Sequence, residues 1–364
     1  MTDKIYYNAF NQIPQIGAVR FKKLAGYFPS MEDAWRAPLS ELLNAGLEQQ
    51  VGEIIVTKRI TINPEAEWEK VGRANVTIIT QADKSYPATL REIHNSPALL
   101  YLRGKIEALS SDHAVAVVGT RKISTYGKQV TGKLASDLAT AGVVIVSGLA
   151  LGVDEQAHRA AVDANAATVA VLGSGIDDNS IYPPSNRLLA RKIMEGRGAL
   201  ISELPLGAQP LKLHFPYRNR IIAGLSRGVI VVEADLKSGS LITAKQALEE
   251  NRQVFAVPGS IYNQMSAGPN NLLKMGAQAV TEAADVLSAL NLEHAEPEKS
   301  ARKIIAETPA EAKLLNLLSN EPLHIDKIIK ESGLTSAEAS SALTLMEIKG
   351  KVRNLGAMQY VRAR

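Results

Sequence analysis

The stretch Val115-Ala116-Val117-Val118-Gly119-Thr120-Arg121 decides the fold of this 364-residue chain. A short β-branched run ends in glycine and opens into a helix-like segment, and residues 147–154 (SGLALGVD) repeat the arrangement about one βα unit later. Parallel sheets deliver such loops to their carboxyl edge, where these folds bind ligands. Arg121 stands where a dinucleotide-binding fold would continue its glycine run, which indicates a turn for phosphate contact. The alternative is that Gly119 only makes a tight turn and Arg121 is solvated.

The composition is that of an ordinary globular protein, with 46% hydrophobic and 21% charged residues. No apolar run is long enough to span a bilayer, and the first residues lack the apolar core of a signal peptide, so we expect a cytoplasmic protein. The absence of cysteine excludes disulfides, thiolate zinc sites and cysteine nucleophiles. The net charge of +4 permits a polyanionic partner without requiring one.

Residues 76–290 alternate between strand-like and helix-length segments, which predicts an α/β domain with a doubly wound, Rossmann-like parallel sheet. The strand-like runs are 76–80, 99–102, 115–118, 143–146, 168–172, 229–232 and 253–257.

The flanks predict two further domains. Residues 1–70 read as a helical domain of the sterile-alpha-motif-like or helix-hairpin-helix type. Within it, residues 13–19 resemble a helix-hairpin-helix element, although Gln15 replaces its first glycine and a plain helix contact is the alternative. Residues 291–305 are polar, as in a linker. Residues 306–364 show three helical segments (310–319, 325–332 and 336–349) and two short strands, the order of a winged helix.

Cations and aromatic residues interleave in residues 212–226, KLHFPYRNRIIAGLS. Single-stranded nucleic acid requires this combination, because cations meet its backbone and flat rings stack on its bases. Residues 233–244 add a turn of small residues that can present backbone N–H groups to an oxyanion. The alternatives are that Arg218 and Arg220 form salt bridges with Glu203 or Glu233, and that Phe215 belongs to the core.

The central region resembles the DNA-processing protein A (DprA, or Smf) family. The matching segments occur in family order: 118–121 (VGTR), 147–154 with His158, 173–177 (GSGID), Tyr182-Pro183 with Asn186, 215–222 (FPYRNRII), 238–240 (SGS) and 257–260 (VPGS). The resemblance implies single-stranded DNA binding without catalysis, protection of incoming DNA and loading of the RecA recombinase during natural transformation. It also implies a homodimer, and no cofactor or metal is expected.

Carried over to this sequence, the phosphate-gripping arginine of the family falls on Arg121, and its lysine and base-stacking aromatic resemble Lys212 and Phe215. The complete predicted DNA-binding set is Gly119, Thr120, Arg121, Lys212, Phe215, Arg218, Asn219, Arg220, Lys237, Ser238, Gly239 and Ser240.

The chain departs from the family pattern in two places. Leu151 stands where the family usually has arginine, and the loop 177–182 is longer and more acidic than usual. We interpret Asp154 as a structural residue near a helix start, with His158 one turn on as its partner rather than a base.

Two other functions remain open. A nucleoside phosphoribohydrolase of the lysine-decarboxylase-like group shares this sheet type, but residues 258–261 (PGSI) lack the second and third glycines of its Pro-Gly-Gly-x-Gly-Thr motif. A transcription regulator would read duplex DNA through helix 336–349, which carries Glu338 and Glu347 and few cations. The terminal Lys349, Lys351, Arg353, Arg362 and Arg364 leave duplex DNA open.

Overall fold

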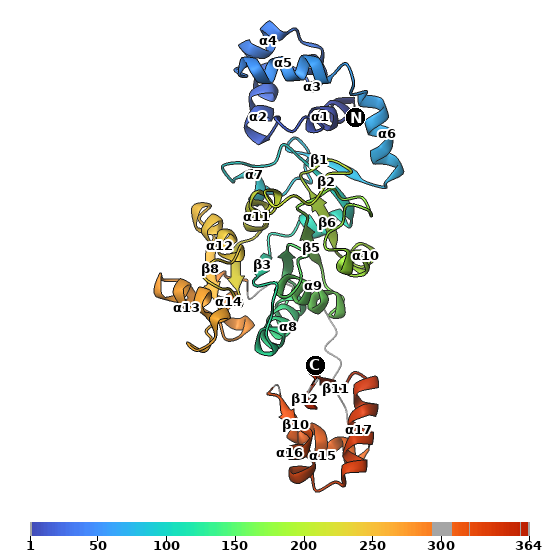
Figure 1. Cartoon of the computed structure of the whole chain (residues 1–364), viewed down its shortest axis with the longest axis vertical. Helices are drawn as coiled ribbons and strands as arrows, with labels where there is room; N and C mark the ends of the chain where they lie inside the picture. The colour runs from blue at the N-terminus through green and yellow to red at the C-terminus, as the bar shows by residue number, and fades with distance from the viewer. Residues whose placement is uncertain (1, 293–307, 320, 357, 363–364) are drawn as a thin grey trace. The chain divides into compact units, whose positions relative to one another are not determined.

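The computed structural model describes residues 2–292, 308–319, 321–356 and 358–362. Contacts divide the chain into two units, Met1–Glu298 and Lys299–Arg364 (Figure 1). Most of the predicted linker 291–305 lies outside the described residues.

Within residues 77–279, all of which the structure describes, nine strands form one sheet in the order β1-β2-β6-β5-β4-β3-β7-β8-β9. Neighbours from β6 to β9 run parallel, whereas β2 pairs antiparallel with both β1 and β6. The doubly wound α/β prediction is confirmed, with an antiparallel edge added. The strands are β1 (Thr77–Thr80), β2 (Leu99–Gly104), β3 (Ala114–Val118), β4 (Val144–Ser147), β5 (Thr168–Val171), β6 (Ala199–Ser202), β7 (Gly228–Val231), β8 (Gln253–Ala256) and β9 (Gln278–Ala279).

Helices cover both faces of the sheet because alternate strand residues point to opposite sides. Val115 and Val117 pack with Leu134 of α8 on one face. Ala116 and Val118 belong to the core of the other face, with Ile222 of α11. Figure 1 shows α8 and α9 together on one side and α11 and α12 on the other. The helices after β1 are α7 (Ala88–Arg91), α8 (Thr125–Thr140), α9 (Val153–Asp163), α10 (Arg187–Glu195), α11 (His214–Leu225), α12 (Ser240–Glu249), α13 (Ala267–Lys274) and α14 (Ala283–Ala289).

The strand order places a topological switch point between β3 and β7. From β3 the chain proceeds through β4 and β5 to β6, and then returns to the other side of β3 to add β7 and β8. In open α/β sheets, ligands bind in the crevice outside the carboxyl ends of the strands at such a point. The loops after β3 and β7 are therefore expected to line a ligand-binding site.

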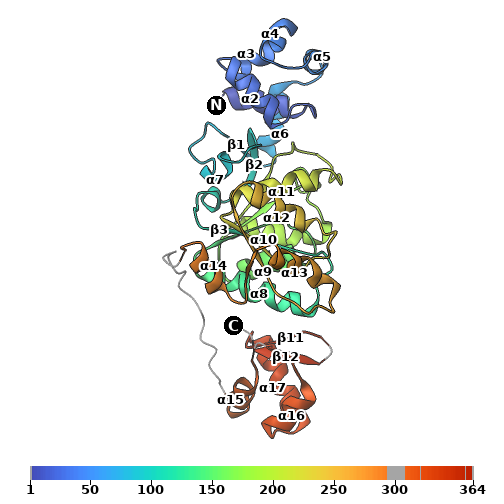
Figure 2. The same cartoon turned by 90° about the vertical axis from the view of Figure 1, so that its left-hand side faces the viewer.

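The N-terminal helices share a core with the antiparallel edge of the sheet (Figure 2). Asn8 Oδ1 accepts a hydrogen bond from the Tyr101 hydroxyl (2.7 Å), and Lys4 Nζ lies 2.9 Å from Asp83 Oδ1. Residues 12–17 link the first two helices, and the N-cap position of the second is Gly17, which has no side chain to cap the helix. The helices are α1 (Thr2–Asn11), α2 (Ala18–Tyr27), α3 (Met31–Arg36), α4 (Leu39–Asn44), α5 (Gln49–Lys58) and α6 (Pro64–Arg73).

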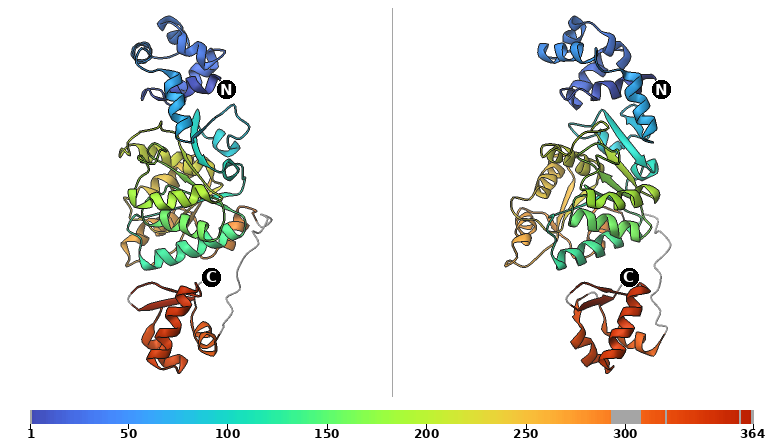
Figure 3. Two further views of the ribbon diagram at one scale, coloured as in Figure 1. Left: turned by 90° about the vertical axis from the view of Figure 1, so that its right-hand side faces the viewer. Right: turned by 45° about the vertical axis from the view of Figure 1, so that its right-hand side comes forward.

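The described part of the C-terminal unit has the winged-helix arrangement, drawn in orange and red in Figure 3. Its helices pack Leu314, Ile328 and Leu343 against a sheet of order β10-β12-β11. The predicted helices and both strands are present, and β10 is an addition. The elements are α15 (Pro309–Leu317), β10 (Leu323–His324), α16 (Ile325–Ser332), α17 (Ser336–Ile348), β11 (Val352–Asn354) and β12 (Gln359–Arg362).

Two of the tail lysines that could serve duplex DNA have an internal partner. The buried carboxylate of Glu311 accepts hydrogen bonds from Lys349 Nζ (3.2 Å) and Lys351 Nζ (2.8 Å). Because Lys351 is itself buried, its charge is directed inward. Arg364 lies outside the described residues.

Candidate nucleic-acid interface

The predicted phosphate turn lies between two other loops at the carboxyl edge of the sheet. Thr120 N donates to the carbonyl of Glu233 after β7 (2.6 Å), and the carbonyl of Thr120 accepts from Val153 N at the start of α9 (3.2 Å). Residues 119–121 are therefore held by the loops after β4 and β7, at the switch point.

Close packing requires glycine in these turns. A Cβ on Gly119 would lie 2.5 Å from Val153 Cγ2 and 2.8 Å from the carbonyl oxygen of Glu233. Gly152 has a φ of +83°, and a Cβ there would collide with the carbonyl of Thr120. The glycines thus let the Arg121 turn and the β4–α9 loop touch through their backbones.

Glu233 is buried and joins the Arg121 turn to the start of α8. Its carboxylate accepts from Ser124 N (2.9 Å) and from Ser124 Oγ (2.5 Å), while Ser124 Oγ caps α8 by accepting from Gly127 N (3.0 Å). This network fixes the backbone on both sides of the exposed Arg121.

Phe215 lies at the centre of the candidate site. Its half-buried ring has the guanidinium carbon of Arg121 5.3 Å from its centroid, and the Tyr182 ring 6.1 Å away, tilted by 50°. A Cβ on Gly173 would approach Phe215 Cδ1 to 2.9 Å, so the glycine after β5 makes room for the ring. The fold thus brings together a cation and an aromatic residue that lie far apart in the sequence.

Arg218 lies beneath Phe215, with its guanidinium carbon 5.9 Å from the ring centroid. It is only 7% exposed and donates from Nη1 to the carbonyls of Gly148 (2.8 Å) and Val171. Burial lowers the pKa of Arg218 to about 10, against the opposing influence of Asp154. This arginine therefore ties the ends of β4 and β5 to α11 from inside the protein.

Asp154 and His158 are both buried, but the histidine has a different partner from the predicted one. Asp154 Oδ2 accepts from Gly148 N (3.1 Å), a residue that precedes the helix, so it orders the β4–α9 loop instead of capping α9. His158 Nδ1 lies 2.8 Å from Thr168 Oγ1, whose hydroxyl donates to the carbonyl of Ile145. Burial lowers the pKa of His158 to about 3 and raises that of Asp154.

The remaining predicted residues divide into paired and exposed groups. Arg220 pairs with Glu203 (2.5 Å), as one of the alternatives proposed. Asn219 is buried and donates to the carbonyl of Gly239 (3.3 Å). Ser238 and Ser240 share a hydroxyl hydrogen bond (2.8 Å). Lys212, before α11, and Lys237, after β7, are exposed.

The two departures from the family pattern also have a structural setting. Leu151 is 43% exposed in the β4–α9 loop. In the acidic loop, Asp178 pairs with Arg103 (2.6 Å), whose hydrogen bond lowers the pKa of that carboxyl group, and Asp177 Oδ1 accepts from Gly207 N (2.7 Å). Both carboxylates are therefore engaged within the protein.

Tyr182 belongs to one of the family motifs, but the sequence predicts no role for it. The structure places its ring beside Phe215, with 41% of its surface exposed. Glu233 was considered only as a partner for arginine, whereas it anchors Ser124. A polar residue directly after a buried strand is the signal that could have indicated this role.

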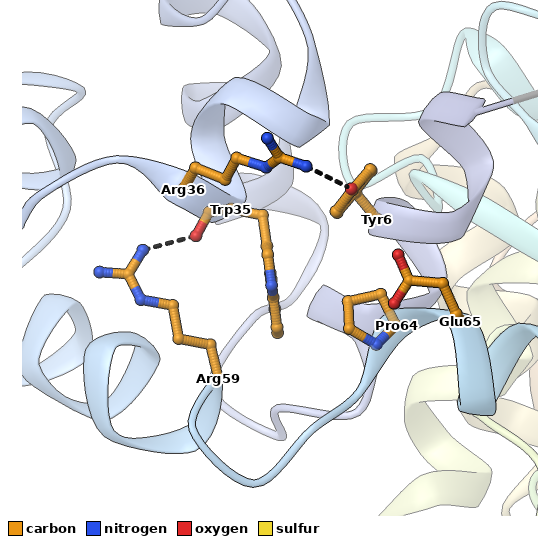
Figure 4. A pocket seen from close by; sticks show the side chains of 6 residues that line it. All are labelled: Tyr6, Trp35, Arg36, Arg59, Pro64 and Glu65. Atoms are coloured by element: carbon orange, nitrogen blue, oxygen red, sulfur yellow. Dashed lines mark hydrogen bonds between the residues drawn. The ribbon is translucent and has the colours of Figure 1, made fainter.

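A hollow of about 370 Å³ lies elsewhere, among the N-terminal helices (Figure 4). Its arginines are engaged locally, because Arg59 donates to the carbonyl of Trp35 (2.5 Å) and Arg36 pairs with Glu32 (2.6 Å). The predicted site residues lie outside it.

In the part of the chain that the structure describes, no group of three or more histidine, aspartate or glutamate side chains is placed to hold a metal ion. Nor does that part of the chain contain a helix of the length and apolarity needed to cross a membrane.

Comparison with known proteins assigns the family. Residues 77–291 match the model of DNA recombination-mediator protein A, and residues 297–358 match the DprA winged helix domain. The chain belongs to the DNA recombination-mediator protein A family. The resemblance seen in the sequence motifs is thereby confirmed.

Relatives within this family cover most of the chain. Protein Smf of Synechocystis is 34% identical over 99% of both chains, and Protein Smf of Escherichia coli is 40% identical over 76% of this chain and 75% of its own length. The X-ray structure of DNA processing protein A from Streptococcus pneumoniae matches with a TM-score of 0.68 and 36% identity, covering 78% of this chain and 97% of that one.

A second solved structure is DNA processing protein A from Helicobacter pylori, described for its single-stranded DNA binding mode. It matches with a TM-score of 0.53 and 33% identity, over 59% of this chain and 95% of its own.

Proposed function

We propose that this chain is a cytoplasmic protein that binds single-stranded DNA at the carboxyl edge of its sheet and acts without catalysis. The observation that carries the proposal is the exposed Arg121 guanidinium held 5.3 Å from the centre of the half-buried Phe215 ring. A cation for phosphate and a ring for a base, side by side at a topological switch point, suit an unpaired strand. The single-stranded DNA binding of the Helicobacter pylori relative supports the same role.

We further propose that the bound strand is protected and passed to a RecA recombinase during natural transformation, and that the protein acts as a homodimer. The support is family membership, since the matching family is named for mediating DNA recombination. We also propose three domains, 1–70, 76–290 and 306–364. The linker 291–305 joins the second domain to the third.

Binding of single-stranded against duplex DNA tests the proposal most directly. We expect fluorescence anisotropy to show a clear preference for a single-stranded oligonucleotide over a duplex of the same length. A preference for duplex would support a winged-helix regulator instead. Steady release of the base from a nucleoside monophosphate would support the phosphoribohydrolase.

Salt dependence separates the roles of Arg121 and Phe215. Each phosphate contact on a single strand contributes about 0.7 to the slope of log affinity against log salt, so Arg121→Ala and Lys212→Ala should each flatten the slope by about that amount. Phe215→Ala should weaken binding by about 1–3 kcal/mol at every salt concentration and leave the slope unchanged, because stacking is uncharged.

Arg227→Ala is the matched control, because Arg227 is exposed directly before β7, at the amino edge of the sheet. It removes the same charge away from the site and should leave the slope unchanged. Wild-type affinity and slope for Arg121→Ala would place the phosphate site elsewhere. Unfolding of Phe215→Ala, seen by circular dichroism, would make Phe215 a core residue.

Truncation tests where the affinity resides. We expect a chain that ends at residue 298 to retain most of its single-stranded DNA affinity, because the candidate site lies entirely in the first unit. Titration by anisotropy measures this. A truncated chain that is folded but does not bind would assign the site to the winged helix. Removing residues 1–75 is the less suitable cut, because it would uncover Tyr101 and its neighbours in the shared core.

A further inference from the structure

The loop of residues 260–263, after β8, exposes two large apolar side chains. Ile261 is 83% exposed and Tyr262 is 94% exposed. Two hydrogen bonds to Ser260 order the loop, since Tyr262 N donates to Ser260 Oγ (3.3 Å) and Asn263 N to the carbonyl of Ser260 (3.0 Å). An aromatic side chain presented on an ordered loop is typical of a contact surface.

This loop adjoins the candidate site through direct bonds. Gln264 Nε2 donates to Asp235 Oδ2 (3.0 Å), and Ala234 N donates to the carbonyl of Met265 (2.7 Å), which joins the segment to the loop after β7. The Tyr126 hydroxyl, in the first turn of α8, donates to the carbonyl of Pro258 (2.8 Å). The exposed Lys237 lies two residues beyond Asp235.

The strand order arranges these loops in a row along the carboxyl edge of the sheet, and we call this row the path. Phe215 lies against Gly173 after β5, the Arg121 turn follows β3, Lys237 follows β7, and Tyr262 follows β8. In the sheet these strands stand in the order β5-β4-β3-β7-β8. Neighbouring strands are about 4.8 Å apart, so the path from the β5 end to the β8 end measures about 19 Å.

We propose that Tyr262 is a second base-stacking position, at the β8 end of a strand-binding path that begins at Phe215. This inference rests on the proposed function and extends it. The path then has an aromatic ring at each end and the cations of Arg121 and Lys237 between them, the pattern that favours a single strand without regard to its sequence. A short oligonucleotide occupies the Phe215 end alone, whereas a longer one engages both rings.

The test is the length dependence of binding. The affinities of oligothymidylates of about 4 to 16 nucleotides, a range that covers known single-strand site sizes, are measured by anisotropy for the wild type and for Tyr262→Ala. We expect the affinity of the wild type to rise with oligonucleotide length. For the long oligonucleotides only, Tyr262→Ala should bind about fivefold to tenfold more weakly than the wild type. Tyr262→Phe, which keeps the ring, should behave as the wild type.

Tyr27→Ala is the control for loss of an exposed tyrosine, because Tyr27 is 44% exposed on α2 among the N-terminal helices. Equal affinities of Tyr262→Ala and wild type at every length would overturn the proposal. So would a loss equal at all lengths, or a change in sedimentation showing that Tyr262 joins two copies of the chain. If the wild type bound no oligothymidylate, the proposed function itself would fail; a wild type that binds but does not respond to Tyr262 would fail only this inference.

Discussion

Replacing Arg218 with methionine is expected to lower the free energy of unfolding by about 3–5 kcal/mol, the effect of removing one partner from a buried charge pair. The buried Asp154 would lose its opposing charge, and the carbonyls of Gly148 and Val171 would lose their donor. Urea unfolding followed by circular dichroism measures the change. DNA affinity should also fall, because Phe215 rests beside this guanidinium.

A double replacement tests whether Arg218 stabilises the fold or contacts DNA directly. Arg218→Met combined with Asp154→Asn should recover part of the lost stability, because both buried charges are then removed. If Arg218→Met has the free energy of unfolding of the wild type and flattens the slope of log DNA affinity against log salt by about 0.7, Arg218 contacts phosphate directly. That is the role it has in the predicted DNA-binding set.

Acidification is expected to destabilise the α/β unit through His158. Its pKa is 6.5 in the unfolded chain and about 3 in the folded protein, because burial disfavours the charged ring. Between these values the unfolded chain binds the extra proton, so stability falls as the pH falls, with a slope of about 1.4 kcal/mol per pH unit. Above pH 6.5 both states are neutral and the effect vanishes. Near pH 3 the total loss in the free energy of unfolding from this histidine approaches about 4–5 kcal/mol.

The measurement compares urea unfolding of the wild type and His158→Gln from pH 7.5 to 4.5. The variant should lose less stability than the wild type as the pH falls, because glutamine does not titrate. His94→Gln, at an exposed position, controls for the loss of a histidine. The same pH slope in wild type and His158→Gln would show that other groups cause the acid sensitivity.

The sheet could be predicted well because its strands are buried on both faces. Each of the seven predicted runs overlaps a strand, since continuous apolar segments such as 115–118 fit only a strand covered by helices on both sides. β6 was missed because Ala199–Ser202 is four residues long and contains a single β-branched apolar residue. It becomes a strand through its pairing with β2 and β5.

The candidate site was predictable in its residue types but not in their arrangement. Glycine after buried strands indicated the carboxyl edge, and the interleaved cations and aromatics indicated a nucleic-acid surface. Burial then separated residues that look alike in sequence, because Arg218 is enclosed under Phe215 while Arg121 stays exposed. Neighbouring positions in one motif cannot show this difference, since it depends on which side of α11 packs on the sheet.

The sequence by itself determined the class of fold, the order of the domains and the family. It also indicated that the candidate site lies at the carboxyl edge of the sheet. These properties depend on local periodicity and on short motifs. Only the tertiary structure decided which side chains meet: Arg121 with Phe215, Glu233 with Ser124, His158 with Thr168, and the exposed Tyr262 beside the loop after β7. The physical reason is that these contacts join segments far apart in the chain, and the strand order that brings them together is set by the packing of the whole sheet.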